Sequence, residues 1–313
     1  MGRYVIRRLL QAIPVLLGST FLIFAIVYAL PGDPVAALGG EKRIDPILAA
    51  QLREKFHLND PLIVQYGYYV RDIFTGDFGQ TFRGVPVSTI FQGKFQVTFQ
   101  LAMTALTIEA VIGLGLGLFA ALRRGRWEDQ GILAITLLLV SVPTLVSGFI
   151  LQLVLGVKLK TEAGIDFFPV AGIGDGWRSY LVPGFVLAGT SIAYLTRLTR
   201  TSLMETLRAD YIRTAVAKGM PRSRVLGRHA LRNSLIPLVT YLGADLGQLM
   251  GGAVITEAIF NLPGIGQQLF SSVYLRENPV VVGIVTLLVL IYLLANLVVD
   301  LLYAVLDPRI RYE

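Results

Sequence analysis

Charge-poor apolar runs of roughly 20 residues, long enough to cross the hydrocarbon of a bilayer as helices, recur along this chain. They restrict its fold strongly, because a backbone in lipid must satisfy its polar groups internally. The sequence is 54% hydrophobic and only 16% charged, whereas soluble domains have roughly 25% charged residues. We therefore expect an all-α polytopic membrane protein with six transmembrane helices. Their predicted ranges are 9–30, 97–122, 131–157, 180–199, 233–257 and 280–305.

The first apolar run is expected to be retained as a span. Basic residues precede it, as in a signal peptide, but the stretch from Leu9 to Leu30 is longer than a signal-peptide core. The following residues, Pro31 to Pro34, also differ from a small-residue cleavage site.

The basic residues gather on one side of the predicted membrane. The opposite side carries residues 31–96, where seven basic residues meet seven acidic ones. Because cytoplasmic loops are enriched in Lys and Arg, we expect both termini in the cytoplasm and a small external segment over 31–96. This placement also accounts for the net charge of +7 without nucleic acid as a partner. The basic sets are Arg3, Arg7 and Arg8; Arg123, Arg124 and Arg126; and those from Arg197 to Arg232.

The external segment has a pattern of its own. Asp45-Pro46 predicts the start of a short amphipathic helix. The aromatic residues that follow, among them Tyr66 and Tyr69, either form a belt at the membrane interface or pack a small cap.

The most informative stretch lies between the fourth and fifth predicted spans, from Asp210 to Asn233. It predicts a helix of small residues ended by Gly219, a turn at Pro221, and a second, basic helix that leads into the membrane. Small side chains such as Ala215 and Ala217 allow a partner to approach closely, and the surrounding cations can pair with an acidic surface. We interpret this stretch as a docking element.

The segment Tyr211 to Gly219 resembles the EAA loop, or coupling helix, of ABC importer permeases, in the form typical of the dipeptide and oligopeptide permease family. The resemblance covers nearly the whole chain and is closest to the B-type subunit. Other blocks in the expected order are Arg7-Arg8-Leu9, Leu30-Pro31-Gly32-Asp33-Pro34, Thr256-Glu257-Ala258-Ile259-Phe260-Asn261-Leu262-Pro263-Gly264-Ile265-Gly266 and Leu306-Asp307-Pro308-Arg309.

This resemblance implies a type I ABC importer permease that moves dipeptides or oligopeptides into the cytoplasm and is not itself an enzyme. Residues 1–93 would form the first helix and an external cap, 94–305 the permease domain with a coupling helix near 210–230, and 306–313 a cytoplasmic tail. The implied partners are a homologous C-type permease, one or two ATPase subunits that bind ATP and Mg²⁺, an external substrate-binding protein, the peptide cargo and membrane lipid.

The resemblance also assigns residues to the ATPase groove. Two departures from the general importer pattern accompany them: Arg213 replaces a Glu, and residues 229–232 lack the usual Ile-x-Leu-Pro ending. The residues carried over are Arg213, Thr214, Ala215, Ala217, Lys218 and Gly219.

Motifs for chemistry within the chain are missing. The sequence has no cysteine, no Gly-x-x-x-x-Gly-Lys-[Ser/Thr] phosphate loop and no acidic or histidine cluster with metal-ligand spacing. We expect no cofactor and no metal in this chain. A secondary transporter, which would need a coupling-ion site, and a membrane-bound enzyme remain as rival classes, and nickel chelate or glutathione as alternative cargo.

Glycines recur at four-residue intervals in two predicted spans. Gly113 and Gly117 indicate a close-packing helix face. Gly243, Gly247 and Gly251 indicate a second such face, either a sliding surface between transport states or static packing.

Three acidic residues, Glu109, Asp245 and Asp300, fall inside predicted spans, where charge is costly. They either touch cargo or protons, or face the helix bundle and accept hydrogen bonds; Asp245 is the best candidate for touching cargo. Asn261, Pro263 and Gly264 predict a turn before a short amphipathic helix, which is either a gate at the pore mouth or an ordinary connection.

Overall fold

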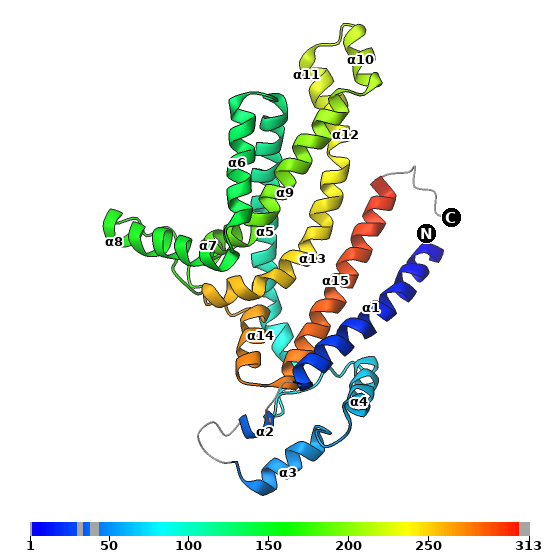
Figure 1. Cartoon of the computed structure of the whole chain (residues 1–313), viewed down its shortest axis with the longest axis vertical. Helices are drawn as coiled ribbons and strands as arrows, with labels where there is room; N and C mark the ends of the chain where they lie inside the picture. Colours follow the sequence, from blue (N-terminus) through cyan, green and yellow to red (C-terminus); the bar gives the residue numbers. More distant parts are fainter. Residues whose placement is uncertain (1, 30–33, 38–43, 307–313) are drawn as a thin grey trace. The chain divides into compact units, whose positions relative to one another are not determined.

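The computed structural model describes residues 2–29, 34–37 and 44–306, and the regular secondary structure of this part is helical, with turns and loops between the helices and an isolated bridge between Gln80 and Pro86. It divides into two compact units. Among the described residues, unit 1 comprises those up to Thr98 together with 263–297, and unit 2 comprises 99–262 and 298–306. The predicted all-α class is confirmed (Figure 1).

The helices are assigned to the units as follows. Unit 1 contains α1 (Gly2–Ala29), α2 (Pro34–Ala37), α3 (Pro46–Lys55), α4 (Leu62–Phe74) and α14 (Ile265–Tyr274). Unit 2 contains α6 (Trp127–Ser141), α7 (Thr144–Leu151), η1 (Gln152–Lys158), α8 (Leu159–Ala163), η2 (Gly176–Tyr180), α9 (Leu181–Leu207), α10 (Asp210–Ala217), α11 (Arg222–Arg224), η3 (Val225–Leu231), α12 (Arg232–Ser234) and α13 (Ile236–Ile259). Two helices, α5 (Val87–Leu122) and α15 (Asn278–Leu306), contribute residues to both units.

Six helices within the described residues are long and apolar enough to cross a membrane, as predicted. Five of the six predicted ranges overlap a candidate span over most of their length; the exception is 131–157. The observed ranges are Val5–Ala29, Val87–Leu122, Thr144–Ala163, Gly176–Leu207, Ile236–Ile259 and Asn278–Val299.

The third predicted span, 131–157, is wrong as a single helix. Helix α6 ends at Ser141, Val142 is extended (φ −89°, ψ 121°), and a new helix, α7, begins after Pro143. A proline clashes with a helical conformation of the preceding residue and cannot donate its own backbone hydrogen bond. The observed span is therefore Thr144–Ala163, and α6, with 15 residues, is too short for one.

Helix α5 corrects a second prediction. It begins at Val87, ten residues before the predicted start of that span, so the predicted boundary between residues 93 and 94 falls inside a continuous helix. The division between the two units lies at 98/99. Residues 30–33 of the second family block and 307–313 of the predicted tail lie outside the described residues.

In unit 1, the segment between the first two spans packs onto α1 and α15. The Asp45 side chain accepts a hydrogen bond from Ile47 N, 2.8 Å away, and so caps α3 as predicted. The Tyr66 hydroxyl donates to Leu17 O on α1 at 2.8 Å, and the Tyr69 hydroxyl lies 2.7 Å from Thr286 Oγ1 on α15. These two aromatic residues therefore pack a cap.

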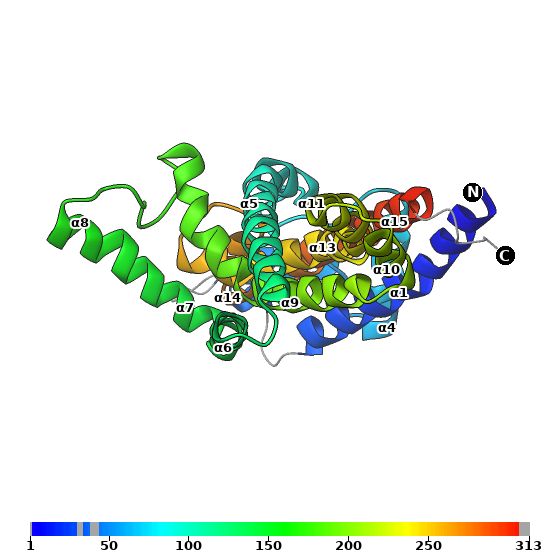
Figure 2. The ribbon, with the colours of Figure 1, turned by 90° about the horizontal axis from the view of Figure 1, so that it is seen from above.

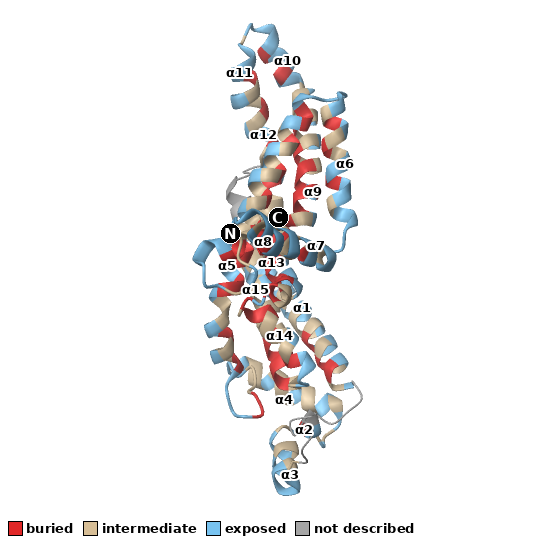
Figure 3. Cartoon of the chain, turned by 90° about the vertical axis from the view of Figure 1, so that its left-hand side faces the viewer, coloured by how far each residue is buried: buried red, intermediate tan, exposed pale blue. Residues whose placement is uncertain are grey.

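In unit 2, α9 is the central helix. Figures 1 and 2 both place it between α6 and α13, with which it makes direct contacts. Buried positions follow α9 along much of its length, as the red segments of Figure 3 show. The close-packing face on α5 is confirmed, because a Cβ added to Gly117 would lie 2.5 Å from Thr199 Cβ, and one added to Gly113 would lie 3.0 Å from Leu195. These two helices approach closely only because glycine stands at both positions.

Candidate functional site

The predicted docking element forms a compact knob that we call the α10 tip, residues Asp210 to Gly219. The helix ends where Gly219 adopts a left-handed conformation (φ +73°), as predicted for its C-terminal cap. Gly219 N donates to Val216 O at 2.9 Å and Met220 N donates to Ala215 O at 3.3 Å, so the last turn is closed by hydrogen bonds. The chain then reverses and continues through Pro221 into α11.

The inner face of the α10 tip belongs to a hydrophobic cluster of unit 2. Ile212 and Ala215 are buried there beside Leu203 of α9 and Val225 of η3. Ala215 is only 7% exposed. Ala215 therefore packs inward against unit 2, and its predicted place in an ATPase groove stays a prediction. The periodicity of a short helix with few large apolar residues did not reveal which alanine faced inward.

The outer face is exposed and carries the other predicted docking residues: Arg213, Thr214, Ala217, Lys218 and Gly219. Val216, 60% exposed, and Tyr211 are exposed apolar residues on the same helix, and they were not predicted as docking residues. The exposed cations that surround this face are Arg213, Lys218, Arg222, Arg224, Arg228 and Arg232. The surface therefore combines an apolar centre with a cationic rim, which suits a partner groove edged by carboxylates.

Two hydrogen bonds in series connect the α10 tip to α12 and α12 to α9. Asn233 Nδ2 donates to the Tyr211 hydroxyl at 3.0 Å, and Ser202 Oγ donates to Ser234 O at 2.9 Å. The first bond joins α10 to α12, and the second joins α12 to α9. Hydrogen bonds thus link α10 through α12 to a spanning helix, α9.

An ion pair that the sequence did not reveal lies on the same unit. Arg200 of α9 donates from Nε to Asp129 Oδ1 at 2.6 Å and from Nη2 to Oδ2 at 2.8 Å. Asp129 also accepts from Gly125 N at 3.0 Å. The Arg200 hydrogen bonds lower the pKa of the Asp129 carboxyl. Its partner lies 71 residues away in the chain, and no local pattern indicates that pairing.

The structure brings together two of the predicted pathway residues. Glu109 of α5 is completely buried, Asp245 of α13 is 3% exposed, and Ser191 and Tyr241 are polar neighbours in the same cluster. Both residues thus face the bundle interior. Neither oxygen of Glu109, nor Oδ2 of Asp245, has a hydrogen-bond partner among the described residues, and buried polar atoms without partners are costly. The other candidate acid, Asp300, lies on α15, and its side chain is outside the described part.

The remaining candidates lie in other parts of the chain. Asn261 is exposed and has a positive φ of 48° in the turn after α13. Pro263 and Gly264 precede α14, the short helix predicted there, whose first residue Ile265 donates from N to Thr98 Oγ1 at 2.8 Å. This hydrogen bond fixes the start of α14 to α5 within unit 1.

The glycine face predicted on α13 is only partly used inside this chain. A Cβ on Gly243 would lie 2.8 Å from Val299 Cγ2 of α15, whereas one on Gly251 would meet nothing within 4 Å. Among the described residues, no group of three or more His, Asp or Glu side chains could hold a metal ion.

Six candidate spans with a short exposed helix between two of them match the architecture expected of an ABC importer permease. The chain belongs to the family described as the binding-protein-dependent transport system inner membrane component, which it matches over residues 113–312, and it matches the N-terminal region of that family over residues 1–100.

Relatives of known name cover the full length of the chain. The glutathione transport system permease protein GsiC of Salmonella choleraesuis is 37% identical over 314 residues, with 100% of both chains covered. The dipeptide transport system permease protein DppB of Alkalihalophilus pseudofirmus is 36% identical over 334 residues, again with 100% of both covered.

A solved structure shares the fold. An inward-facing structure of the MetNI methionine ABC transporter superposes with a TM-score of 0.57 at 18% identity, covering 70% of this chain and 96% of that one. The predicted ABC importer permease fold is thus confirmed.

Proposed function

We propose that this chain is the pore-forming permease of an ATP-driven importer that carries small peptides into the cytoplasm across a bacterial inner (plasma) membrane. Its full-length similarity to a dipeptide permease and to a glutathione permease supports a peptide cargo, since glutathione is itself a short peptide. Both termini and the α10 tip face the cytoplasm in this proposal, as the distribution of basic residues indicates.

The α10 tip is the observation that carries the proposal. One or two separate ATPase subunits bind ATP and Mg²⁺ and receive the tip in a groove. Ala217 and Val216 enter that groove, and the exposed cations pair with carboxylates at its edge. ATP-driven movement then reaches α9 through the hydrogen bonds at Tyr211 and Ser202.

A second, homologous permease of C type completes the pore, and an external substrate-binding protein delivers the peptide. A cavity of about 660 Å³ in unit 2, between α5 and the segment from η2 to the start of α9, supports a pathway of weak contacts. Its polar lining includes Gln100, Thr104 and Thr107, and none of its lining residues is charged. Uncharged walls allow varied peptides to enter and leave, because no single group holds them tightly.

The test compares two alanines that are both exposed. Ala217→Arg places a long cation in the proposed groove contact, whereas Ala163→Arg makes the same change on α8. With the ATPase subunits coexpressed, we expect Ala217→Arg to abolish their copurification and ATP-dependent uptake of a labelled dipeptide, while Ala163→Arg retains both. Normal uptake and copurification by Ala217→Arg would refute the docking role. Peptide uptake by this chain without ATPases, driven by an ion gradient, would establish a secondary transporter instead.

A further inference from the structure

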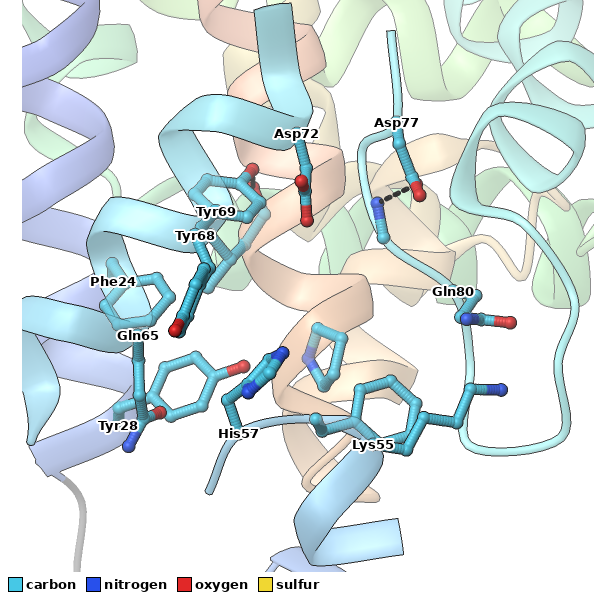
Figure 4. A pocket seen from close by; sticks show the side chains of 14 residues that line it. Phe24, Tyr28, Lys55, His57, Gln65, Tyr68, Tyr69, Asp72, Asp77 and Gln80 are labelled. Carbon is cyan, nitrogen blue, oxygen red and sulfur yellow. Dashed lines mark hydrogen bonds between the residues drawn. The ribbon is translucent and has the colours of Figure 1, made fainter. Parts of the chain in front are cut away.

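Unit 1 contains a cavity of about 170 Å³, which we call the cap cavity (Figure 4). Residues of α3, α4 and the loop 77–80 line it together with the last turns of α1 and the first turns of α15. Those parts of α1 and α15 belong to predicted membrane spans. The cavity therefore lies at the ends of two candidate spans, at the end of α1 opposite its N-terminus.

Acidic and basic side chains line opposite sides of the cap cavity. Asp72 and Asp77 lie along one side, and Lys55 and His57 lie along the other (Figure 4). Asp77 Oδ1 accepts a hydrogen bond from Gly79 N at 2.8 Å, which leaves Oδ2 able to accept another. Lys55 makes no ion pair with any described residue; its ammonium lies 5.7 Å from the ring centroid of Phe56. Asp72 Oδ1 accepts hydrogen bonds from Arg71 Nε at 3.0 Å and Nη2 at 2.9 Å, and His57 Nδ1 lies 3.4 Å from Asp60 Oδ2. Asp77 and Lys55 are therefore the charged groups of the wall that make no ion pair with a described residue, while Asp72 Oδ2 and His57 Nε2 keep hydrogen-bonding capacity.

A buried acceptor in the cavity wall also lacks a donor. Gln65 Nε2 donates to Asp60 O at 2.8 Å, which orients the amide and leaves Oε1 buried, with no partner among the described residues. An unsatisfied buried acceptor costs about 1–3 kcal/mol. A ligand with hydrogen-bond donors would remove that cost.

The position of His57 is also unusual. It adopts φ +54° directly after α3, a conformation that favours glycine, and its ring stacks on Tyr68 with the centroids 4.4 Å apart. This stacking holds the imidazole against the cavity. Backbone conformations that cost free energy are often found at binding sites, where the surrounding structure holds them in place.

Size restricts what the cavity can hold. It is smaller than the roughly 300 Å³ at which pockets for drug-sized ligands begin, and similar to a cavity of about 150 Å³ that holds benzene. We propose that the cap cavity binds a small zwitterion, with a primary ammonium group at Asp72 and Asp77 and an anionic group at Lys55 and His57. Two sources have this chemistry: a free α-amino acid, and the phosphoethanolamine headgroup of a membrane lipid. The proposal does not rest on peptide transport.

The experiment uses the full-length chain in nanodiscs. For a free amino acid, equilibrium binding of radiolabelled glycine, leucine and phenylalanine is measured in phosphatidylcholine nanodiscs, whose headgroup has no primary ammonium. For a lipid, nanodiscs are formed from equal amounts of phosphatidylethanolamine and phosphatidylcholine, and the lipid retained after delipidation is measured by mass spectrometry. The variants are Lys55→Gln and the double variant Asp72→Asn, Asp77→Asn, and the matched control is Glu54→Gln, an exposed charge on α3 outside the cavity.

We expect one source to bind, and each cavity variant to weaken binding at least ten-fold while Glu54→Gln leaves it unchanged. Blocking either charge of an amino acid, as in its methyl ester or its N-acetyl form, should weaken binding equally. The thermal stability of each variant is measured in parallel, so that loss of binding is interpreted only for a folded chain; Tyr68→Ala provides a further variant that alters the wall. Absence of binding from both sources at millimolar concentrations, or binding that the cavity variants do not change, would overturn the proposal.

Discussion

Arg200 of α9 holds Asp129 of α6 through two parallel hydrogen bonds, 2.6 Å from Nε to Oδ1 and 2.8 Å from Nη2 to Oδ2. Asp129 is almost completely buried and Arg200 is about one-fifth exposed. Paired geometry of this kind is stronger and more specific than a single contact between charges. The pair therefore fixes α6, which is too short to cross a membrane, to the central helix of unit 2.

Removing the carboxyl should destabilise unit 2, because Arg200 would keep its charge without a partner. Loss of one member of a fully buried pair costs about 3–5 kcal/mol, and we expect Asp129→Ala to cost somewhat less, since Arg200 retains some contact with solvent. Thermal unfolding in detergent should show a clear fall in the midpoint. Glu205→Ala, an exposed acid on α9, should show almost none. Equal midpoints for the two variants would contradict a stabilising role for the pair.

The same pair predicts a pH dependence. Because Arg200 lowers the pKa of Asp129 in the folded state, the unfolded state takes up the proton first as the pH falls. The contribution to stability is complete above the unfolded pKa of about 3.9, and is lost as the pH falls through the lower folded pKa. The stability difference between the unaltered chain and Asp129→Asn should therefore shrink with falling pH below about 4. If the stability difference grows as the pH falls below about 4, the pKa of Asp129 is not lowered in the folded state.

Ala215 and Ala217 should differ although only two residues separate them. Ala215→Leu adds volume to a cluster that already contains Ile212 and Leu203, and overpacking of this kind costs about 1–3 kcal/mol. Ala217→Leu adds an exposed side chain and should leave the unfolding midpoint nearly unchanged. Measured midpoints in detergent provide the comparison. A larger loss for Ala217→Leu would mean that the inner and outer faces of α10 are reversed.

Gly117 should tolerate no side chain at its contact with α9. A Cβ there would lie 2.5 Å from Thr199 Cβ and 2.6 Å from Thr196 O, so the helices must separate. We expect Gly117→Ala to lower stability by about 1–3 kcal/mol. Gly115→Ala, two residues earlier on α5, meets nothing within 4 Å and should be neutral or slightly stabilising. Equal stability of the two variants would show that α5 and α9 are less closely packed.

Asp245 provides a test of how cargo or protons use the bundle. We expect Asp245→Asn, which keeps the shape and removes the charge, to change the transport rate by an amount worth about 1 kcal/mol, the scale of one hydrogen bond. Uptake in reconstituted vesicles containing the whole complex measures it, with Glu109→Gln as the matched change on the facing helix. Complete loss of uptake with an intact complex would instead make a charge or proton at this cluster indispensable.

Cysteine labelling checks the orientation, since the chain has no cysteine of its own. Ser223→Cys and Thr75→Cys each place a thiol at an exposed position. In intact cells, an impermeant reagent should label Thr75→Cys and should reach Ser223→Cys only after the cells are opened. Labelling of Ser223→Cys from outside would reverse the proposed orientation.

The sequence carried much of the fold and part of the site. The number of spans and the turn at Gly219 follow from length, hydropathy and glycine chemistry, which act within one segment. The helix break at Pro143 could have been predicted from the same local rules. The apolar run continues across this proline, however, and it favoured the prediction of a single helix. Continuous hydropathy is therefore weaker evidence for helix continuity than the chemistry of one proline.

The sequence by itself determined that this chain spans a membrane, and its resemblance to a coupling helix predicted where a partner docks. Only the tertiary structure decided that Ala215 faces inward, that Glu109 and Asp245 belong to one cluster, and that Asp129 pairs with Arg200. Each of these depends on which residues of distant segments meet when helices pack. Hydropathy depends only on composition within a window, whereas side-chain contacts depend on the rotation and register of whole helices, which no single segment encodes.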